Sequence, residues 1–257
     1  MNEQKISLNV AKDLYLSQVV WTYAFLGILF IVNIVKIGYA AFKSDFTQGF
    51  FNTSFIASNF YMFIIGLMAA QFLAYFVGNG VTRKDYFYGN VLSSIGLSLT
   101  IAISTSIVFL IEKFILNLVN IPYKAQTINE IELDGNILGD VIQMMIISPY
   151  VDPNENVLLA TIILATNIFI FYILGWMISI SFYRYGAFYG IISVLFAIGI
   201  KLLKDNLIRI TLDLPTIAYF ENLPDMPIVV AIFGVLLIII VIFHVIHTIT
   251  KRVPVKL

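Results

Sequence analysis

Six long apolar runs, separated by polar segments, limit what this chain can fold into more than any other feature of its sequence. A helix rises about 1.5 Å per residue, so about 20 apolar residues are enough to cross the ~30 Å hydrocarbon core of a bilayer. We therefore predict an all-α membrane protein in which a single transmembrane domain holds six helices. The predicted spans lie at about residues 17–39, 55–78, 91–119, 157–182, 187–203 and 228–249.

Composition supports a membrane protein and excludes several functional classes. Apolar residues make up 60% of the 257 positions and charged residues only 12%, whereas soluble domains have about 45–50% and about 25%. The chain has no cysteine, which excludes disulfides, thiolate metal sites and cysteine nucleophiles. Its formal net charge is zero, so we expect no nucleic acid partner.

The positions of lysine and arginine predict how the chain is oriented in the membrane. If the N-terminus is inside, the short inner segments hold most of the cations, and the longer outer loops hold fewer. Because short cytoplasmic loops are enriched in lysine and arginine, we predict a multi-pass protein of the cell (plasma) membrane with both termini in the cytoplasm. Between Met1 and about Leu16, apolar residues recur at helical spacing, which predicts a separate amphipathic helix on the bilayer surface.

The most distinctive local motif is the charged segment from Gly80 to Asn90, between the second and third spans. Thr82 is followed three residues later by Asp85, a capping-box pattern that is typical of helix starts. We predict a helix of two to three turns on the inner membrane surface, with aromatic rings at the interface and charges facing water. Two interpretations stay open. The segment is either a loop whose cations only keep it on its side of the bilayer, or a coupling helix that docks into a separate motor protein. The predicted coupling residues are Val81, Thr82, Arg83, Lys84, Asp85, Tyr86, Phe87 and Tyr88.

A few polar residues lie inside the predicted spans, and four of them are candidates for a pathway or for packing: Gln71, Asn167, Lys36 and Glu112. Ionisable residues within a span are functional candidates because their desolvation is costly. Lys36 and Glu112, however, lie close enough to the outer ends to snorkel or to pair with each other. For all four residues, two roles stay open: contact with a cargo, or packing with their polar groups satisfied by neighbours. The sequence shows no chain of carboxylates within the spans, so we expect the energy source for transport to lie elsewhere.

The sequence offers little support for catalysis or metal binding. His244 and His247 are three residues apart but lack a nearby acid, so we expect interfacial packing and no metal site. The segment Gly96-Leu97-Ser98-Leu99 is similar to the nucleophile of intramembrane serine proteases, but Leu99 replaces the second glycine, so we expect no catalytic residue. Neither Gly-Lys-Ser nor Gly-Lys-Thr occurs, so if ATP drives this protein, another polypeptide binds it.

Small and hydroxyl-bearing residues within the spans predict close helix packing. Gly66, Ala70, Ala74 and Gly78 recur every four residues along the second span, a stripe that lets another helix approach closely. The third span is rich in serine and threonine, whose hydroxyls are expected to bond back to their own helix or across to a neighbour. We expect such stripes to pack inside one bundle, and the alternative is that one of them seals a dimer.

Together, the surface helix, the six spans with both ends inside, the Gly-Val-Thr-Arg-Lys-Asp insertion and the broken apolar segment before the last span resemble the membrane subunit of a type-2 ATP-binding-cassette exporter. The resemblance implies that Val81 to Tyr88 bind a cytoplasmic ATPase, which carries ATP and Mg, so that this chain itself holds no cofactor. It also implies short external helices at about Leu207 to Pro227 and pairing with a second permease copy or a related permease. Small bacterial peptide exporters, including those that expel phenol-soluble modulins, have permeases of this size. The cargo implied is an amphipathic peptide or a lipid-like molecule.

The segment from Asn120 to Asn156 is longer than is usual in that family. Apolar residues at helical spacing predict a short surface helix within Asn136 to Ser148. This segment also supports an alternative function, a standalone membrane immunity or sensory protein that binds an extracellular peptide without a motor.

Overall fold

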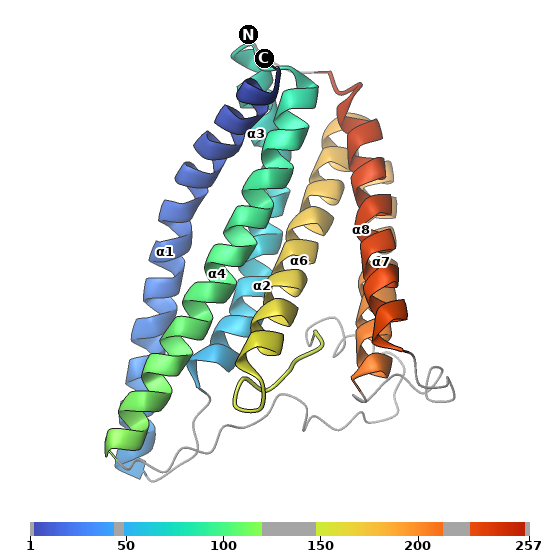
Figure 1. Cartoon of the computed structure of the whole chain (residues 1–257). Coiled ribbons are helices and arrows are strands. Elements are labelled where there is room, and N and C mark those ends of the chain that lie inside the picture. The colour runs from blue at the N-terminus through green and yellow to red at the C-terminus, as the bar shows by residue number, and fades with distance from the viewer. Residues whose placement is uncertain (1–2, 44–48, 120–147, 213–226, 255–257) are drawn as a thin grey trace.

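A computed structural model of the chain describes residues 3–43, 49–119, 148–212 and 227–254. Helices make up 89% of these residues, and no strand occurs among them. Figure 1 shows the helices α1 (Glu3–Lys43), α2 (Phe50–Leu67), α3 (Ala69–Gly78), α4 (Arg83–Val119), α6 (Val157–Tyr185), α7 (Ala187–Thr211) and α8 (Ile228–Thr250).

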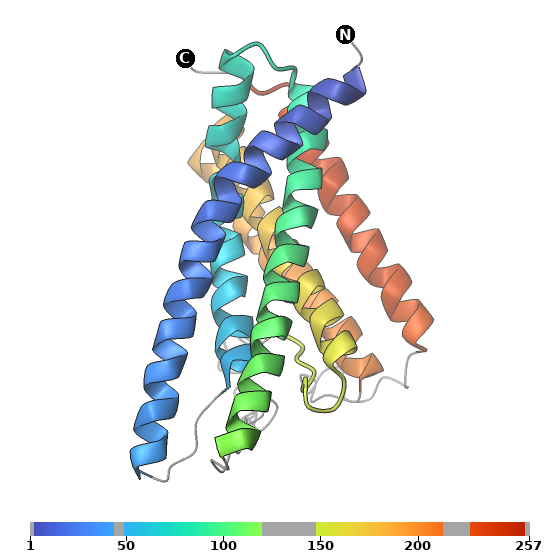
Figure 2. The same ribbon diagram turned by 60° about the vertical axis from the view of Figure 1, so that its left-hand side comes forward.

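In the described part of the chain, six helical segments are long and apolar enough to cross a membrane, which confirms the prediction of an all-α protein with six candidate spans. One of these segments consists of α2 and α3, which meet at a turn at Met68. Figures 1 and 2 show that α1 begins and α8 ends at the same end of the bundle. We call this the N/C end and the opposite one the loop end.

The N-terminal segment differs from the prediction of a separate surface helix over Met1 to Leu16. Helix α1 is continuous from Glu3 to Lys43, and Val10 and Leu14 are buried in the bundle that α1 forms with α4. Gly89 of α4 permits a close approach, because a Cβ atom there would lie 2.6 Å from Cγ1 of Val10. This packing holds the segment in line with the rest of α1.

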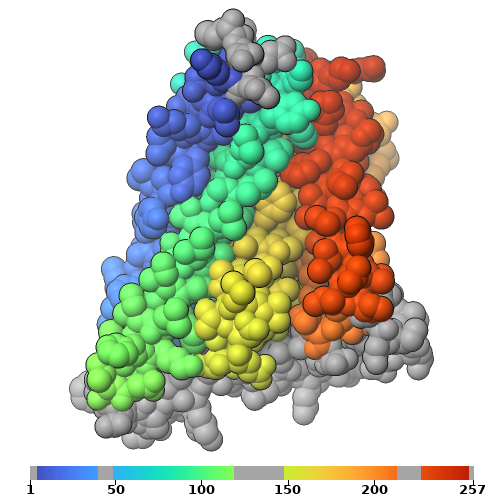
Figure 3. All heavy atoms as spheres, viewed as in Figure 1, coloured from blue at the N-terminus to red at the C-terminus, as the bar shows by residue number. Residues whose placement is uncertain are grey.

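Helix α6 is the centre of the bundle and contacts α2, α4, α7 and α8. Residues 172–181 are all buried, so every face of this stretch is covered, as expected for a helix that is apolar all round. Against α2 the two backbones nearly touch, since a Cβ atom on Gly66 would lie 2.1 Å from the carbonyl oxygen of Tyr172. Figure 3 shows α4, α6 and α8 side by side on one face.

The hydroxyl groups of α4 bond in both predicted ways. Within the helix, Ser98 donates to the carbonyl oxygen of Ser94 at 2.8 Å. Three further pairs join α4 to α1, α2 and α6: Tyr15 with Thr100 at 2.8 Å, Ser54 with Thr105 at 2.8 Å and Ser106 with Thr161 at 2.6 Å. Side-chain hydrogen bonds therefore hold α4 to three neighbours inside one chain.

Besides α1, the two spans that extend furthest beyond their predicted bounds are α4 and α7. Helix α4 begins at Arg83, eight residues before the predicted start at 91, and α7 continues to Thr211, well past the predicted end at about 203. The predicted external helices begin at Leu207, which lies within α7, and the part from 213 to 226 falls outside the described residues. The surface helix predicted within 136–148 also falls outside them, except for Ser148.

Candidate functional site

Residues 79–85, which we call the α3–α4 corner, turn the chain sharply at the N/C end. Gly80 has a φ of 87°, a left-handed conformation that favours glycine. At the start of α4, the backbone N–H of Asp85 donates to Oγ1 of Thr82 at 3.1 Å, and the Thr82 hydroxyl donates to Oδ2 of Asp85 at 2.6 Å. Thr82 and Asp85 therefore cap this helix as the sequence pattern predicts, with the carboxylate bonded to the threonine hydroxyl.

Hydrogen bonds tie the corner and the first turn of α4 to three other segments. The Ser7 hydroxyl of α1 donates to Oδ1 of Asp85 at 2.8 Å, and the Asp85 side chain is buried. Nε of Arg83 donates to the carbonyl oxygen of Val253, after α8, at 3.0 Å. The Tyr86 hydroxyl donates to the carbonyl oxygen of Ala69, at the start of α3, at 2.5 Å. The corner is thus braced against α1, α3 and the segment after α8.

The eight predicted coupling residues do not form a separate helix on the membrane surface. Residues 83–88 are the first turns of α4, and Tyr86 and Phe87 are buried in the bundle, not at an interface. The Phe87 ring lies 5.4 Å from the Trp176 ring and 5.0 Å from the His247 ring, measured between centroids. They are buried because α4 passes straight into the bundle beside α6 and α8. The exposed members of the set are Thr82, Lys84 and Tyr88.

Replacing Asp85 by alanine is expected to lower the free energy of unfolding by about 2 kcal/mol, since a buried charge-assisted cap and the bond to Ser7 are lost together. Ser7→Ala removes only one of these bonds and is expected to cost less than half as much. Unfolding in detergent, followed by tryptophan fluorescence, to which the buried Trp176 contributes, measures both variants. Equal stability of Asp85→Ala and the parent chain would show that the cap contributes nothing.

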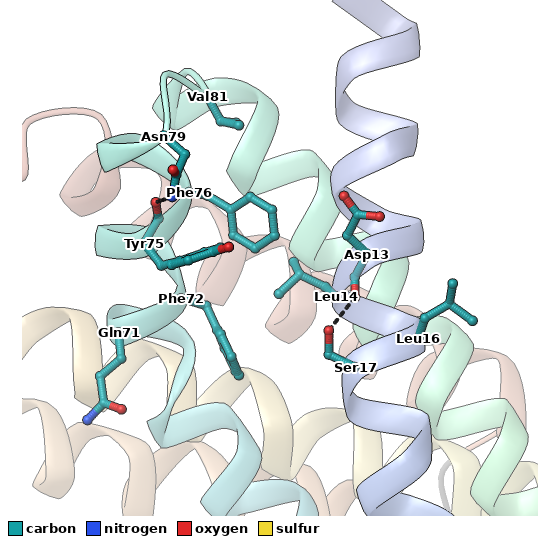
Figure 4. Close-up of a pocket in the computed structure, with 10 residues that line it drawn as sticks. All are labelled: Asp13, Leu14, Leu16, Ser17, Gln71, Phe72, Tyr75, Phe76, Asn79 and Val81. Atoms are coloured by element: carbon teal, nitrogen blue, oxygen red, sulfur yellow. Dashed lines mark hydrogen bonds between the residues drawn. The ribbon is translucent and has the colours of Figure 1, made fainter.

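A groove of about 910 Å³ lies between α1 and α3, close to the N/C end (Figure 4). Its lining is amphipathic, with polar groups from Asp13, Ser17 and Gln71 and rings from Phe72 and Phe76. Gln71, a predicted pathway or packing residue, is exposed on this groove.

Glu112 forms hydrogen bonds to α1 and to the start of α2 at the loop end. Its carboxylate accepts from Nδ2 of Asn33 at 3.1 Å and from the backbone N–H of Phe50, the first residue of α2, at 2.9 Å. A carboxylate at a helix N-terminus satisfies a free N–H group and stabilises the helix dipole. Lys36 is exposed, and no ion pair joins it to Glu112 in the structure as described. The side chain of α1 that contacts Glu112 is therefore Asn33, whereas the sequence suggested Lys36.

The fourth predicted residue, Asn167, lies in a buried group of charged side chains between α6 and α7. Lys204 is fully buried; its Nζ donates to Oδ1 of Asn167 at 2.6 Å and forms an ion pair with Asp205. Lys201 also pairs with Asp205, at 2.5 Å, and the Arg209 side chain is buried one turn beyond. We call Asn167, Lys201, Lys204, Asp205 and Arg209 the ionic cluster.

The sequence reasoning missed this cluster. Lys204 follows Ala187 by 17 residues and therefore lies about 25 Å along α7, where the predicted span had already ended. The available signal was the spacing of Lys201 and Asp205, four residues apart, which lets opposite charges pair on one helix face. Because these charges pair with one another, the helix continues through them, although hydropathy alone predicts that it ends there.

The structure brings Asn167 into the ionic cluster but keeps Gln71, Lys36 and Glu112 apart from it and from each other. Within the described residues, no group of three histidine, aspartate or glutamate side chains is placed to hold a metal ion. No family model, curated protein or solved structure matches this chain in the comparisons.

Proposed function

We propose that this chain is the permease subunit of an ATP-driven exporter and that a separate cytoplasmic ATPase binds its α3–α4 corner. The observation that supports this most is the bracing of the corner by Ser7, Val253 and Ala69. A force applied to a braced corner moves the attached helix ends as one body. Lys84 lies exposed within the corner and Tyr88 lies exposed one turn beyond it, and they offer a charge and a ring to a partner.

The turn at Met68 provides a place for such a movement. On one side of it, Gly66 holds α2 against the backbone of α6. On the other side, α3 is a short helix of 10 residues whose first carbonyl is bonded to Tyr86 of α4. Hinges are commonly a few residues at the ends of such elements. In this proposal, α3 and the first turns of α4 move together relative to α2 and α6 when the motor closes.

The groove between α1 and α3 supports an amphipathic peptide or a lipid-like molecule as the cargo. Phe72 and Phe76 provide apolar surface, while Asp13 and Gln71 provide polar contacts on the same groove. Sites of this kind combine aromatic walls with a few polar groups that fix orientation. In this proposal, a second permease copy, or a related permease, completes the pathway. The protein lies in the plasma membrane, and both of its termini are in the cytoplasm.

Site-specific crosslinking tests the proposal directly, because the chain contains no cysteine and one introduced cysteine reports on one position. With a photocrosslinker attached, Lys84→Cys is expected to capture a soluble protein that hydrolyses ATP, in membranes of the source cell. Glu155→Cys, exposed at the loop end, is the control and is expected to capture none. Equal labelling from the two positions, or no ATPase captured from position 84, would contradict the proposal and favour the standalone immunity or sensory protein.

A further inference from the structure

A second pocket, of about 310 Å³, lies at the N/C end between the last turns of α6 and α8. Three cations line it, Arg184, Lys251 and Arg252, together with His247, Tyr185 and Thr248. No carboxylate is among these lining residues. The pocket therefore concentrates positive charge at one point of the bundle end.

Arg184 is held in place at this pocket by the protein itself. Its Nη1 donates to the carbonyl oxygens of Thr248 at 3.2 Å and Ile249 at 2.8 Å, and its guanidinium lies 4.5 Å from the centre of the Tyr185 ring. A guanidinium has five N–H donors, and Nη1 supplies only two of them. The remaining donors of Arg184 have no partner in the part of the chain that the structure describes. A planar, fixed guanidinium of this kind matches the oxygens of a phosphate group.

Exposed aromatic and apolar side chains adjoin the pocket. The rings of Tyr185 and Tyr189 lie 5.4 Å apart, the Phe188 ring lies 5.5 Å from that of Tyr189, and all three side chains are exposed. Ile191 and Leu195 continue the exposed apolar surface along α7. Tyrosine and other aromatic rings gather where a membrane meets water, and basic pockets between helix ends bind anionic lipid head groups.

We propose that this pocket binds the phosphate group of an anionic phospholipid, whose acyl chains lie along the exposed apolar side chains of α7. The positive lining selects an anionic over a zwitterionic head group, and the adjoining surface selects a lipid over free phosphate. This site is separate from the α3–α4 corner and does not depend on the proposed exporter function.

Lipid retention tests the site. The full chain is purified from vesicles of equal phosphatidylglycerol and phosphatidylcholine, and the lipid that stays bound is quantified by mass spectrometry. We expect the parent chain to retain phosphatidylglycerol preferentially, and Lys251→Gln with Arg252→Gln to reduce that preference at least about fivefold, the effect of one cation at a membrane surface. The matched control is Lys5→Gln with Lys12→Gln, which removes two exposed cations of α1 near the same end.

Two results would overturn the proposal. One is an equal loss of phosphatidylglycerol in the double variant and in the α1 control, which would mean that surface charge alone attracts the lipid. The other is displacement of phosphatidylglycerol by millimolar inorganic phosphate, which would assign the pocket to the free anion. If the double variant does not fold, the single variants Lys251→Gln and Arg252→Gln carry the same prediction with a smaller reduction.

Discussion

Asp205→Leu is expected to lower the free energy of unfolding by about 3–5 kcal/mol, because it leaves buried cations without their shared carboxylate. Asp205 and Lys204 are fully buried, and Lys201 is 5% exposed. Both lysines form ion pairs with Asp205, so one substitution breaks two pairs. Leucine is larger than aspartate, so Asp205→Asn, which removes the charge and keeps the size of the side chain, separates the loss of charge from overpacking. Unfolding of the chain in lipid nanodiscs, followed by tryptophan fluorescence, measures the effect.

Lys204→Met is the matched comparison for this prediction. It removes a buried charge from the same cluster but leaves Asp205 paired with Lys201. We expect it to cost clearly less than Asp205→Leu, since the remaining carboxylate still has a cation. The double variant with Asp205→Leu is expected to be less destabilised than the sum of the single changes, because the two residues interact. If Asp205→Leu were no worse than Lys204→Met, the carboxylate would not be the centre of the cluster.

Gly66→Ala is expected to destabilise the bundle by about 2–3 kcal/mol, through overpacking between α2 and α6. The added Cβ atom would lie 2.1 Å from the carbonyl oxygen of Tyr172 and 3.1 Å from the backbone nitrogen of Trp176. Both are backbone atoms of the central helix, so neither can rotate away as a flexible side chain would. A drop in the thermal midpoint, measured in nanodiscs, is the expected result.

Gly199→Ala is the control for Gly66→Ala. Gly199 is also within a helix, but a Cβ atom there would meet nothing within 4 Å. Alanine has a higher helix propensity than glycine, so this change is expected to be neutral or to stabilise by up to about 1 kcal/mol. Similar midpoints for the two variants would mean that α2 and α6 are not in close contact. In that case the small-residue stripe of the second span would be available to a second chain.

The number of candidate spans and their helical type followed from the sequence, whereas several helix ends did not. The start of α6 at Val157 and the bounds of α8 agree closely with the predicted spans, since both apolar runs are long and sharply bounded. Helices α1, α4 and α7 are all longer than predicted. In each, polar residues near the end pack or pair inside the bundle, as Asp85 does with Ser7, so a change in hydropathy does not end the helix.

The candidate sites were predictable to different degrees. The capping pattern of Thr82 and Asp85 identified the start of α4, because a cap depends only on residues close in sequence. The bonds of Arg83 to Val253 and of Asn33 to Glu112 join residues far apart in the chain, and no spacing rule indicates them. Whether the α3–α4 corner binds a motor stays a prediction.

The sequence alone determined that six apolar segments are helical and long enough to cross a membrane, because segment length and hydropathy are local properties. Only the tertiary structure decided which side of each helix is covered. It buries Tyr86 and Phe87 in the bundle, gathers the ionic cluster around Asp205 and leaves Gln71 exposed on a groove. The physical reason is that burial depends on the neighbouring helix that each face meets. The sequence of a single segment does not specify that neighbour.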